Sequence, residues 1–279
     1  MRLLRRSRSR AVVLVYHRVA ETLDDPYGLA VRPDTFSRHL ELLAREHPIV
    51  PLVQLVETLP GARFPHGAIA VSFDDGYADN LSEALPIAEA LPITVFVTVE
   101  PILHGGRFWW DAIASLEPRL RAELHAELKG LPGPERSHRI ATLNGRDDAD
   151  RGRPLTVDEL RELASRPGVE IGAHTLSHPS LALLSADEQE SEMLEARNRL
   201  ESLLGGPVTL LAYPFGKPND VSGETERLAR GAGYRAAFTS VPGCLVPSSP
   251  TFALPRLTVH ECPPQKLARR VRECLGESS

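Results

Sequence analysis

The sequence contains little cysteine and no strong excess of either charge. Its three cysteines are an odd number and have no metal-type spacing. We expect free thiols in a reducing compartment, with one disulfide late in the chain as the alternative. The net charge of −5 gives no indication of a nucleic-acid partner. With 279 residues, 42% of them hydrophobic, the chain can form a substantial core.

Long apolar runs are also missing from the beginning of the sequence. Residues 1–10 are basic, and the apolar stretch that follows, 11–16, ends at His17 after six residues. A secretory signal needs about 7–15 apolar residues and a membrane span about 20. We therefore expect a cytoplasmic protein with a basic N-terminal tail at 1–10, whose arginines could make peripheral contact with anionic lipid.

No glycine-rich nucleotide fingerprint follows the first apolar segment, which counts against a doubly wound nucleotide-binding fold. Apolar, β-branched segments instead alternate with amphipathic ones, such as the predicted helices 79–90 and 185–204. The predicted strands are 11–16, 68–73, 93–99, 169–173, 208–212, 234–239 and 257–259. Alternating strands and helices imply parallel pairing with helices outside. About seven such units predict a barrel-like (β/α) arrangement in one domain, residues 11–279.

The segment 101–154 interrupts this alternation. It begins with an aromatic group around Trp110 and Asp111, continues with a charged helical stretch at 119–129, and ends in a polar loop. It has too few apolar residues for a core of its own. We interpret it as an insertion in the barrel rather than a separate domain.

Polar clusters follow four of the predicted strands. They are His17, Asp74 with Asp75, His174 with His178, and the segment 213–216. In a parallel barrel, the carboxyl ends of the strands meet on one rim, and active sites form there. The four clusters therefore predict one site on that rim.

Asp74 and Asp75 end a buried strand and precede Gly76. Side chains alternate along an extended backbone, so the two carboxylates point in different directions. One can hold a metal while the other handles a proton. A solvated Asp-Asp-Gly turn is the alternative interpretation.

His174 and His178 are four residues apart, but they do not form the helical zinc motif. Thr175 stands where that motif has a glutamate, and Pro179 follows the pair. Two imidazoles and one carboxylate nevertheless make a three-ligand site with open positions, which is typical of a catalytic metal. Two solvent-facing loop histidines are the alternative.

Three motifs together resemble those of the polysaccharide deacetylases, the chitooligosaccharide-deacetylase-like family of carbohydrate esterases. The motifs are Ser72–Gly76, His174–His178 and Ala212–Gly216, and the resemblance covers roughly Val12 to His260. It implies a distorted (β/α) barrel that removes N-acetyl or O-acetyl groups from sugars with the help of a metal. Zn²⁺ is the expected metal, although Co²⁺, Ni²⁺ and Fe²⁺ accept the same ligand types.

The resemblance also implies residue roles. Asp74 would be the general base, and Tyr213, with Phe215 nearby, would lend a backbone N–H to the oxyanion. The implied metal ligands are Asp75, His174 and His178.

The sequence departs from the family pattern in three places. Ala212 stands where the family has an arginine that braces the base; Arg256 could replace it or be a surface arginine. The Asp-Trp pair of the fourth motif is missing, so Trp110 and Asp111 are candidates for substrate contact, or the tryptophans pin a loop to the core.

The third departure concerns the general acid. The family supplies it from a leucine–any–histidine motif, and His260 is off that spacing by one residue. His17, at the end of the first strand, is the candidate that we place in this role, against the alternative of a packed or capping histidine.

We therefore expect a hydrolase of carbon–nitrogen bonds other than peptide bonds, acting on an acetylated sugar, oligosaccharide or glycan precursor. Two alternatives stay open. One is a hydrolase of a non-sugar amide on the same scaffold. The other is an inactive carbohydrate-binding barrel, which Ala212 and the missing fourth motif keep possible.

Overall fold

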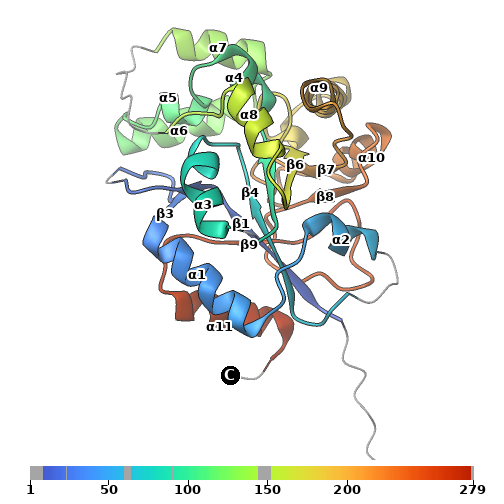
Figure 1. Cartoon of the computed structure of the whole chain (residues 1–279). Helices are drawn as coiled ribbons and strands as arrows, with labels where there is room; N and C mark the ends of the chain where they lie inside the picture. Colours follow the sequence, from blue (N-terminus) through green and yellow to red (C-terminus); the bar gives the residue numbers. More distant parts are fainter. Residues whose placement is uncertain (1–8, 23, 60–63, 90, 144–151, 278–279) are drawn as a thin grey trace, which may run out of the picture.

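A computed structural model describes residues 9–22, 24–59, 64–89, 91–143 and 152–277 of the chain (Figure 1). Most of the predicted basic tail therefore lies outside the described residues. None of the described helices has the length and apolar composition that crossing a bilayer requires.

The described strands form one parallel sheet of seven strands, in the order β8-β7-β6-β5-β4-β1-β9. Its members are β1 (Ala11–Tyr16), β4 (Ala68–Phe73), β5 (Ile93–Val97), β6 (Val169–Ala173), β7 (Leu210–Ala212), β8 (Ala236–Phe238) and β9 (Leu257–Thr258). A second sheet pairs β2 (Arg18–Val19) with β3 (Ala30–Val31). Since β8 and β9 form the two edges of the large sheet, the barrel is not closed by strand pairing. The predicted distorted (β/α) barrel is confirmed.

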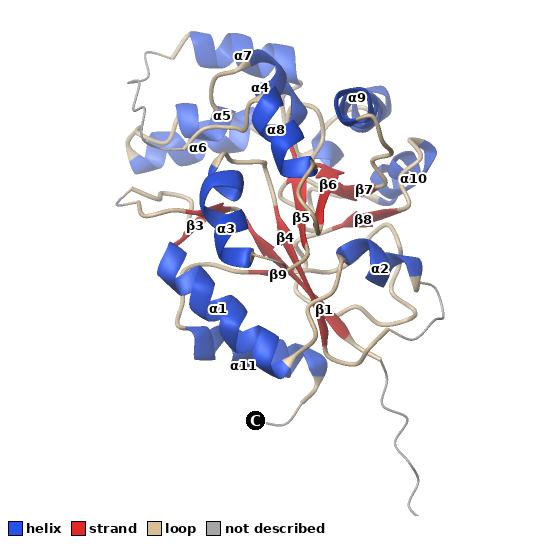
Figure 2. Ribbon diagram, in the orientation of Figure 1, coloured by secondary structure: helices blue, strands red, loops and turns tan. Residues whose placement is uncertain are grey.

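Most helices lie on the outer face of the sheet (Figure 2). The exception is α2 (Leu52–Glu57), whose Leu52, Leu55 and Val56 belong to the core on the opposite face of the strands. The helices outside the segment 101–154 are α1 (Pro33–Glu46), α2 (Leu52–Glu57), α3 (Leu85–Ala88), α8 (Val157–Ala164), α9 (Ala186–Leu204), α10 (Gly223–Gly231) and α11 (Pro264–Leu275). A 3₁₀ turn, η2 (Leu181–Leu183), precedes α9. Within the segment 101–154 the described helices are α4 (Val99–His104, which starts just before it), α5 (Trp109–Ala112), α6 (Pro118–Leu128) and α7 (Gly133–Ala141). Helices α5, α6 and α7 lie together at the upper left of Figure 1, beyond the ends of β4 and β5.

The predicted helix 79–90 is confirmed as helical from Asp79 to Ala88, although part of it is π-helical rather than α-helical. The structure has a π-helical segment, η1 (Asn80–Ala84), followed by the single turn of α3. Pro86, in the first turn of α3, has no backbone N–H, so the normal i to i−4 hydrogen bond is lost at that position.

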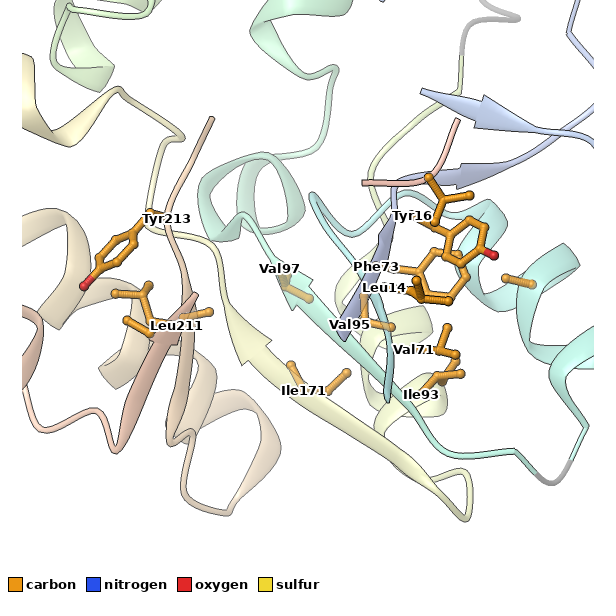
Figure 3. Close-up of a cluster of buried hydrophobic side chains, with 14 of the residues drawn as sticks. Leu14, Tyr16, Val71, Phe73, Ile93, Val95, Val97, Ile171, Leu211 and Tyr213 are labelled. Atoms are coloured by element: carbon orange, nitrogen blue, oxygen red, sulfur yellow. The ribbon is translucent and has the colours of Figure 1, made fainter. Parts of the chain in front are cut away.

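Alternate residues of the strands enter two different cores. Val71 and Phe73 of β4 pack outward with Leu14 and Tyr16 of β1, which lie opposite them in the strand register (Figure 3). Ala70 belongs instead to the second core, whose strand members include many small residues. Burial on both faces explains why these strands read as continuous apolar runs.

Close packing around position 172 of β6 leaves room for glycine but not for a larger residue. A Cβ at this position would collide with the ring of Phe96 on β5 and would lie 3.2 Å from the carbonyl oxygen of Leu210. We expect Gly172→Ala to lower the free energy of unfolding by about 1–3 kcal/mol, the usual cost of overpacking. Gly206→Ala, where a Cβ meets nothing within 4 Å, is the control for urea denaturation. Equal stabilities of the two variants would contradict this packing argument.

The three cysteines are free thiols in this structure. The Sγ atoms of Cys244 and Cys274 lie 2.6 Å apart, so the late pairing considered as an alternative would join these two. Cys262 is buried elsewhere, against His39.

Candidate active site

A pocket of about 600 Å³ opens at the carboxyl ends of the central strands. His17, Asp74, His174 and Tyr213 are the residues that directly follow β1, β4, β6 and β7, and all four line the pocket. The parallel register brings these positions onto one rim, as the sequence predicts. The polar clusters of the sequence therefore meet in one place.

Asp75, His174 and His178 present one ligand atom each to a common point. The Oδ1 atom of Asp75 lies 3.5 Å from Nε2 of His174 and 3.4 Å from Nε2 of His178, and all three ligand atoms lie within 4.8 Å of one another. Ligands bonded tetrahedrally to zinc at about 2.1 Å are separated by about 3.4 Å. The spacing therefore fits a shared divalent cation.

The protonation of the two imidazoles also fits a metal site. Burial lowers the pKa of His174 to about 4 and that of His178 well below its usual range, so both rings are neutral. Nδ1 of His174 lies 2.7 Å from the carbonyl oxygen of Ala212 and must donate to it, which leaves a lone pair on Nε2. Nδ1 of His178 is buried without a hydrogen-bond partner among the described residues. If Nε2 of His178 bound a metal, the ring proton would lie on Nδ1.

Asp74 is held apart from this cluster by Arg256. The guanidinium donates from Nη1 to Oδ1 at 2.6 Å and from Nη2 to Oδ2 at 2.7 Å, and its Nε donates to the carbonyl oxygen of Thr239. Arg256 is only 1% exposed, so it is not a surface arginine. Arg256 reaches Asp74 across 182 residues of sequence. It supplies the guanidinium that the alanine at position 212 lacks.

The two acids have opposite electrostatic environments. Burial alone would raise the pKa of Asp74, but the charge and hydrogen bonds of Arg256, with the nearby His174, hold it at about 2. Burial raises the pKa of Asp75, which lacks such a partner. A cation bonded to Asp75 would counter that effect. Asp74, whose Oδ2 lies 3.9 Å from Nε2 of His174, is ionised and adjacent to the ligand set.

The backbone of the site is strained. Among the described residues, five that are not glycine have positive φ, and four of them belong to the site: Asp75, Thr175, His178 and Phe215, with φ of 74°, 64°, 64° and 59°. Left-handed backbone of this kind costs about 1–3 kcal/mol per residue and persists only where the surroundings enforce it. Such strain aims side chains that a regular strand or helix would direct elsewhere.

Three histidines besides the two candidate ligands line the pocket. His17 is half-buried, and it lies close enough to Asp74 and Asp75 to lower the pKa of both carboxyl groups. His260 is exposed, and its Nδ1 lies 2.8 Å from the carbonyl oxygen of Gly28. His125 comes from α6 and was not predicted. No sequence signal distinguishes it, because it lies within a charged helical stretch.

The prediction that the Tyr213 N–H holds an oxyanion is wrong. This N–H donates to the carbonyl oxygen of Phe238 at 3.0 Å as part of the sheet, and the Tyr213 hydroxyl donates away from the pocket to Phe252. Phe215 lines the pocket, and its ring centroid lies 5.0 Å from that of His178. The Phe215 N–H makes no backbone hydrogen bond within the described part of the chain.

The aromatic group of the segment 101–154 packs behind the histidine pair. The ring of Trp110 lies 4.3 Å from that of His178, and its Nε1 donates to the hydroxyl of Tyr77. Trp110 lines the pocket but is only 4% exposed, in keeping with the alternative that the tryptophans pin a loop. Asp111 does not line this pocket. Its carboxylate accepts the Tyr77 hydroxyl at 2.8 Å, and the predicted contact of Asp111 with substrate stays a prediction.

Comparison with known proteins places this geometry in a family. The sequence profile described as "Polysaccharide deacetylase" matches residues 61–237, more than half of the chain. A protein of Bacillus subtilis named "Putative polysaccharide deacetylase YxkH" is 24% identical over 193 residues. That alignment covers 68% of this chain and 51% of the relative, so the chain spans about half the length of this curated protein.

Solved structures share the fold. The deacetylase PplD of Streptococcus pyogenes, in complex with acetate, has a TM-score of 0.69 at 18% identity, over 95% of this chain and 99% of its own. IcaB from Ammonifex degensii has a TM-score of 0.70 at 18% identity, over 95% of this chain and 97% of its own. At these identities the similarity concerns the fold alone.

Proposed function

The chain belongs to the polysaccharide deacetylase family, and from that premise we propose that it hydrolyses N-acetyl or O-acetyl groups of a sugar, an oligosaccharide or a glycan precursor. The observation that carries the proposal is the convergence of Asp75, His174 and His178 beside the carboxylate of Asp74, which lies outside this ligand set and is paired with Arg256. An ionised carboxylate next to a metal-type ligand set is the arrangement that metal-assisted hydrolysis needs.

Asp75, His174 and His178 would hold a divalent metal, for which Zn²⁺ is our first choice. Co²⁺, Ni²⁺ and Fe²⁺ are the alternatives, because imidazole and carboxylate ligands suit all four. When bound, the metal supplies Lewis-acid polarisation of the acetyl carbonyl and lowers the pKa of water.

Asp74 accepts a proton from the water that attacks the acetyl carbon. Arg256 fixes both carboxylate oxygens and keeps the carboxylate ionised, since its pKa lies near 2. A base of such low pKa has little intrinsic strength, so its contribution rests on position beside the attacking water.

The negative charge of the tetrahedral oxyanion needs a donor fixed at the rim. The Phe215 N–H donates a hydrogen bond to the oxyanion, because the Tyr213 N–H is already bonded within the sheet. Its left-handed backbone, with φ of 59°, directs the peptide differently from the preceding strand. One well-placed donor of this kind stabilises a transition state by about 3–4 kcal/mol.

His17 protonates the leaving amine. His125 is less suited, because burial and the charges of Lys129 and Lys217 lower its pKa and keep it neutral. We expect His17→Gln to reduce kcat by about 10²- to 10⁴-fold, the usual effect of losing a general acid. The same substitution at His125 or His260 should cost less than tenfold. Steady-state rates of the three variants decide the matter, and an unimpaired His17→Gln enzyme would remove His17 from the mechanism.

The proposed activity is tested by acetate release. Metal-free protein, with and without added Zn²⁺, is incubated with N-acetylglucosamine oligomers, with O-acetylated xylan and with a panel of linear and cyclic amides. We expect zinc-dependent acetate from a sugar substrate. Turnover of the amide panel alone would favour a hydrolase of non-sugar amides. Saturable oligomer binding without turnover would identify an inactive carbohydrate-binding barrel.

A further inference from the structure

The loop between His174 and His178 is held by side chains from two helices outside the site. Glu192 of α9 accepts the N–H of Leu176 at 3.0 Å and that of Ser177 at 2.8 Å on one carboxylate oxygen. Its other oxygen accepts the Ser177 hydroxyl at 2.5 Å. Glu192 is only 8% exposed, so these bonds form in a largely dry environment.

Arg136 of α7 also bonds this loop. Its Nη1 donates to the carbonyl oxygen of His178 at 3.0 Å and its Nη2 to the hydroxyl oxygen of Ser177 at 2.7 Å. Its guanidinium also lies 5.3 Å from the ring centre of Trp109, whose Nε1 donates to the same His178 carbonyl. Arg136 is 2% exposed, which is rare for an arginine unless its donors are satisfied.

These contacts act on a backbone that would not adopt its conformation unaided. Thr175 and His178 both have φ of 64°, and within the loop the His178 N–H donates to Thr175 Oγ1. The backbone N–H groups of Val99 and Glu100 also donate to the carbonyl oxygens of Thr175 and Leu176. Arg136 and Glu192 form hydrogen bonds with residues 176 to 178, which lie between Thr175 and His178 or include His178 itself. The orientation of the His178 ring depends on the backbone conformation at positions 176 to 178.

We propose that Arg136 and Glu192 are positioning residues, which hold the loop 174–178 so that Nε2 of His178 faces Asp75 and His174. The inference rests on the proposed metal site and adds a task for the segment 101–154, which brings Arg136 to the loop. Gly133, at the start of α7, is part of this fit, because a Cβ there would lie 3.0 Å from the Ser177 side chain.

We call Arg136 and Glu192, with their hydrogen bonds to the loop 174–178, the clamp. Two substitutions disturb these hydrogen bonds while the size of the side chain stays similar. Arg136→Lys keeps the charge, but a single ammonium cannot reproduce the fork that bonds two acceptors in a fixed geometry. Glu192→Gln replaces one acceptor oxygen by an NH₂ group, so at least one buried donor loses its partner. Arg139→Lys and Glu195→Gln are matched controls. Arg139 lies on α7 with Arg136 and Glu195 lies on α9 with Glu192, and both form ion pairs that are exposed to solvent.

The experiment measures Zn²⁺ affinity by competition with a chromophoric chelator, together with the Tm of each metal-free protein. We expect Kd for Zn²⁺ to rise about 10- to 100-fold in both clamp variants, as for other residues that orient metal ligands, and to stay unchanged in the controls. The visible spectrum of the Co²⁺-loaded protein should change in the clamp variants only.

A purely structural role would lower Tm without changing Kd or the Co²⁺ spectrum, and that result would overturn the inference. If Glu192→Gln does not fold, Arg136→Lys decides the question alone. Wild-type protein that binds no divalent metal would refute the proposed metal site and this inference with it. Tight binding by the wild type and by both variants would refute the clamp only.

Discussion

Asp74→Asn is expected to lower kcat by about 10²- to 10⁴-fold while the protein still binds one metal ion. The amide cannot accept a proton from water, but it leaves Asp75, His174 and His178 in place. The loss should therefore appear in turnover and not in Kd for Zn²⁺. Acetate release at saturating Zn²⁺, measured beside metal content, separates the two quantities.

The same substitution has a second consequence, on stability. It leaves the buried Arg256 without its anionic partner, and breaking a buried ion pair on one side costs about 3–5 kcal/mol. Urea denaturation must therefore confirm that the variant is folded at the assay temperature. A folded Asp74→Asn protein with wild-type turnover on every substrate would show that Asp74 is not the base.

His174→Ala is expected to abolish metal binding and turnover together. The substitution removes one of the three proposed metal ligands and also the bond to the carbonyl oxygen of Ala212 that orients the ring. The effect on Kd should exceed the roughly 10- to 100-fold change that follows loss of a residue behind the ligands. Metal analysis after dialysis against Zn²⁺ should find less than a stoichiometric amount.

His47→Ala is the control, because His47 is a buried histidine that does not line the pocket. It should retain stoichiometric zinc and normal turnover. If His174→Ala kept one tightly bound zinc ion, the ligand set would be wrong even if activity were lost.

The fold could be predicted from the sequence because the strands are buried on both faces. Runs such as 11–16 and 169–173 contain no charged residue, or only one, and their pattern predicts strands without further information. The ends of the strands were predicted less accurately. The predicted strands 208–212 and 234–239 are shorter in the structure, where they span Leu210–Ala212 and Ala236–Phe238. The strand propensity of the residues does not show where hydrogen bonding to the adjacent strand stops.

The candidate site was predictable wherever a residue directly follows a strand. Asp74 and His174 occupy such positions, so strand prediction alone brings them together on one rim. Tyr213 also follows a strand, but its N–H belongs to the sheet ladder, and the pattern of residue types does not show which peptide is free.

Contacts that cross the chain could not be predicted in this way. Arg256 meets Asp74 across 182 residues, and Arg136 meets the His178 loop through a segment whose sequence has no barrel-like pattern. The sequence offers Arg256 only as a candidate that could equally lie on the surface, and it gives no signal for Arg136. The tertiary structure shows that both arginines are buried. Burial of an arginine is the signal that identifies them.

A crystal structure of the zinc-loaded protein, with anomalous diffraction recorded at the zinc absorption edge, tests the central claim most directly. We predict one anomalous peak bonded to Asp75, His174 and His178 at about 2.0–2.2 Å, with the Asp74 carboxylate still paired to Arg256 and not bonded to the metal. A peak elsewhere, or a peak bonded to Asp74 in place of Asp75, would contradict the assignment of a metal ligand and a separate base.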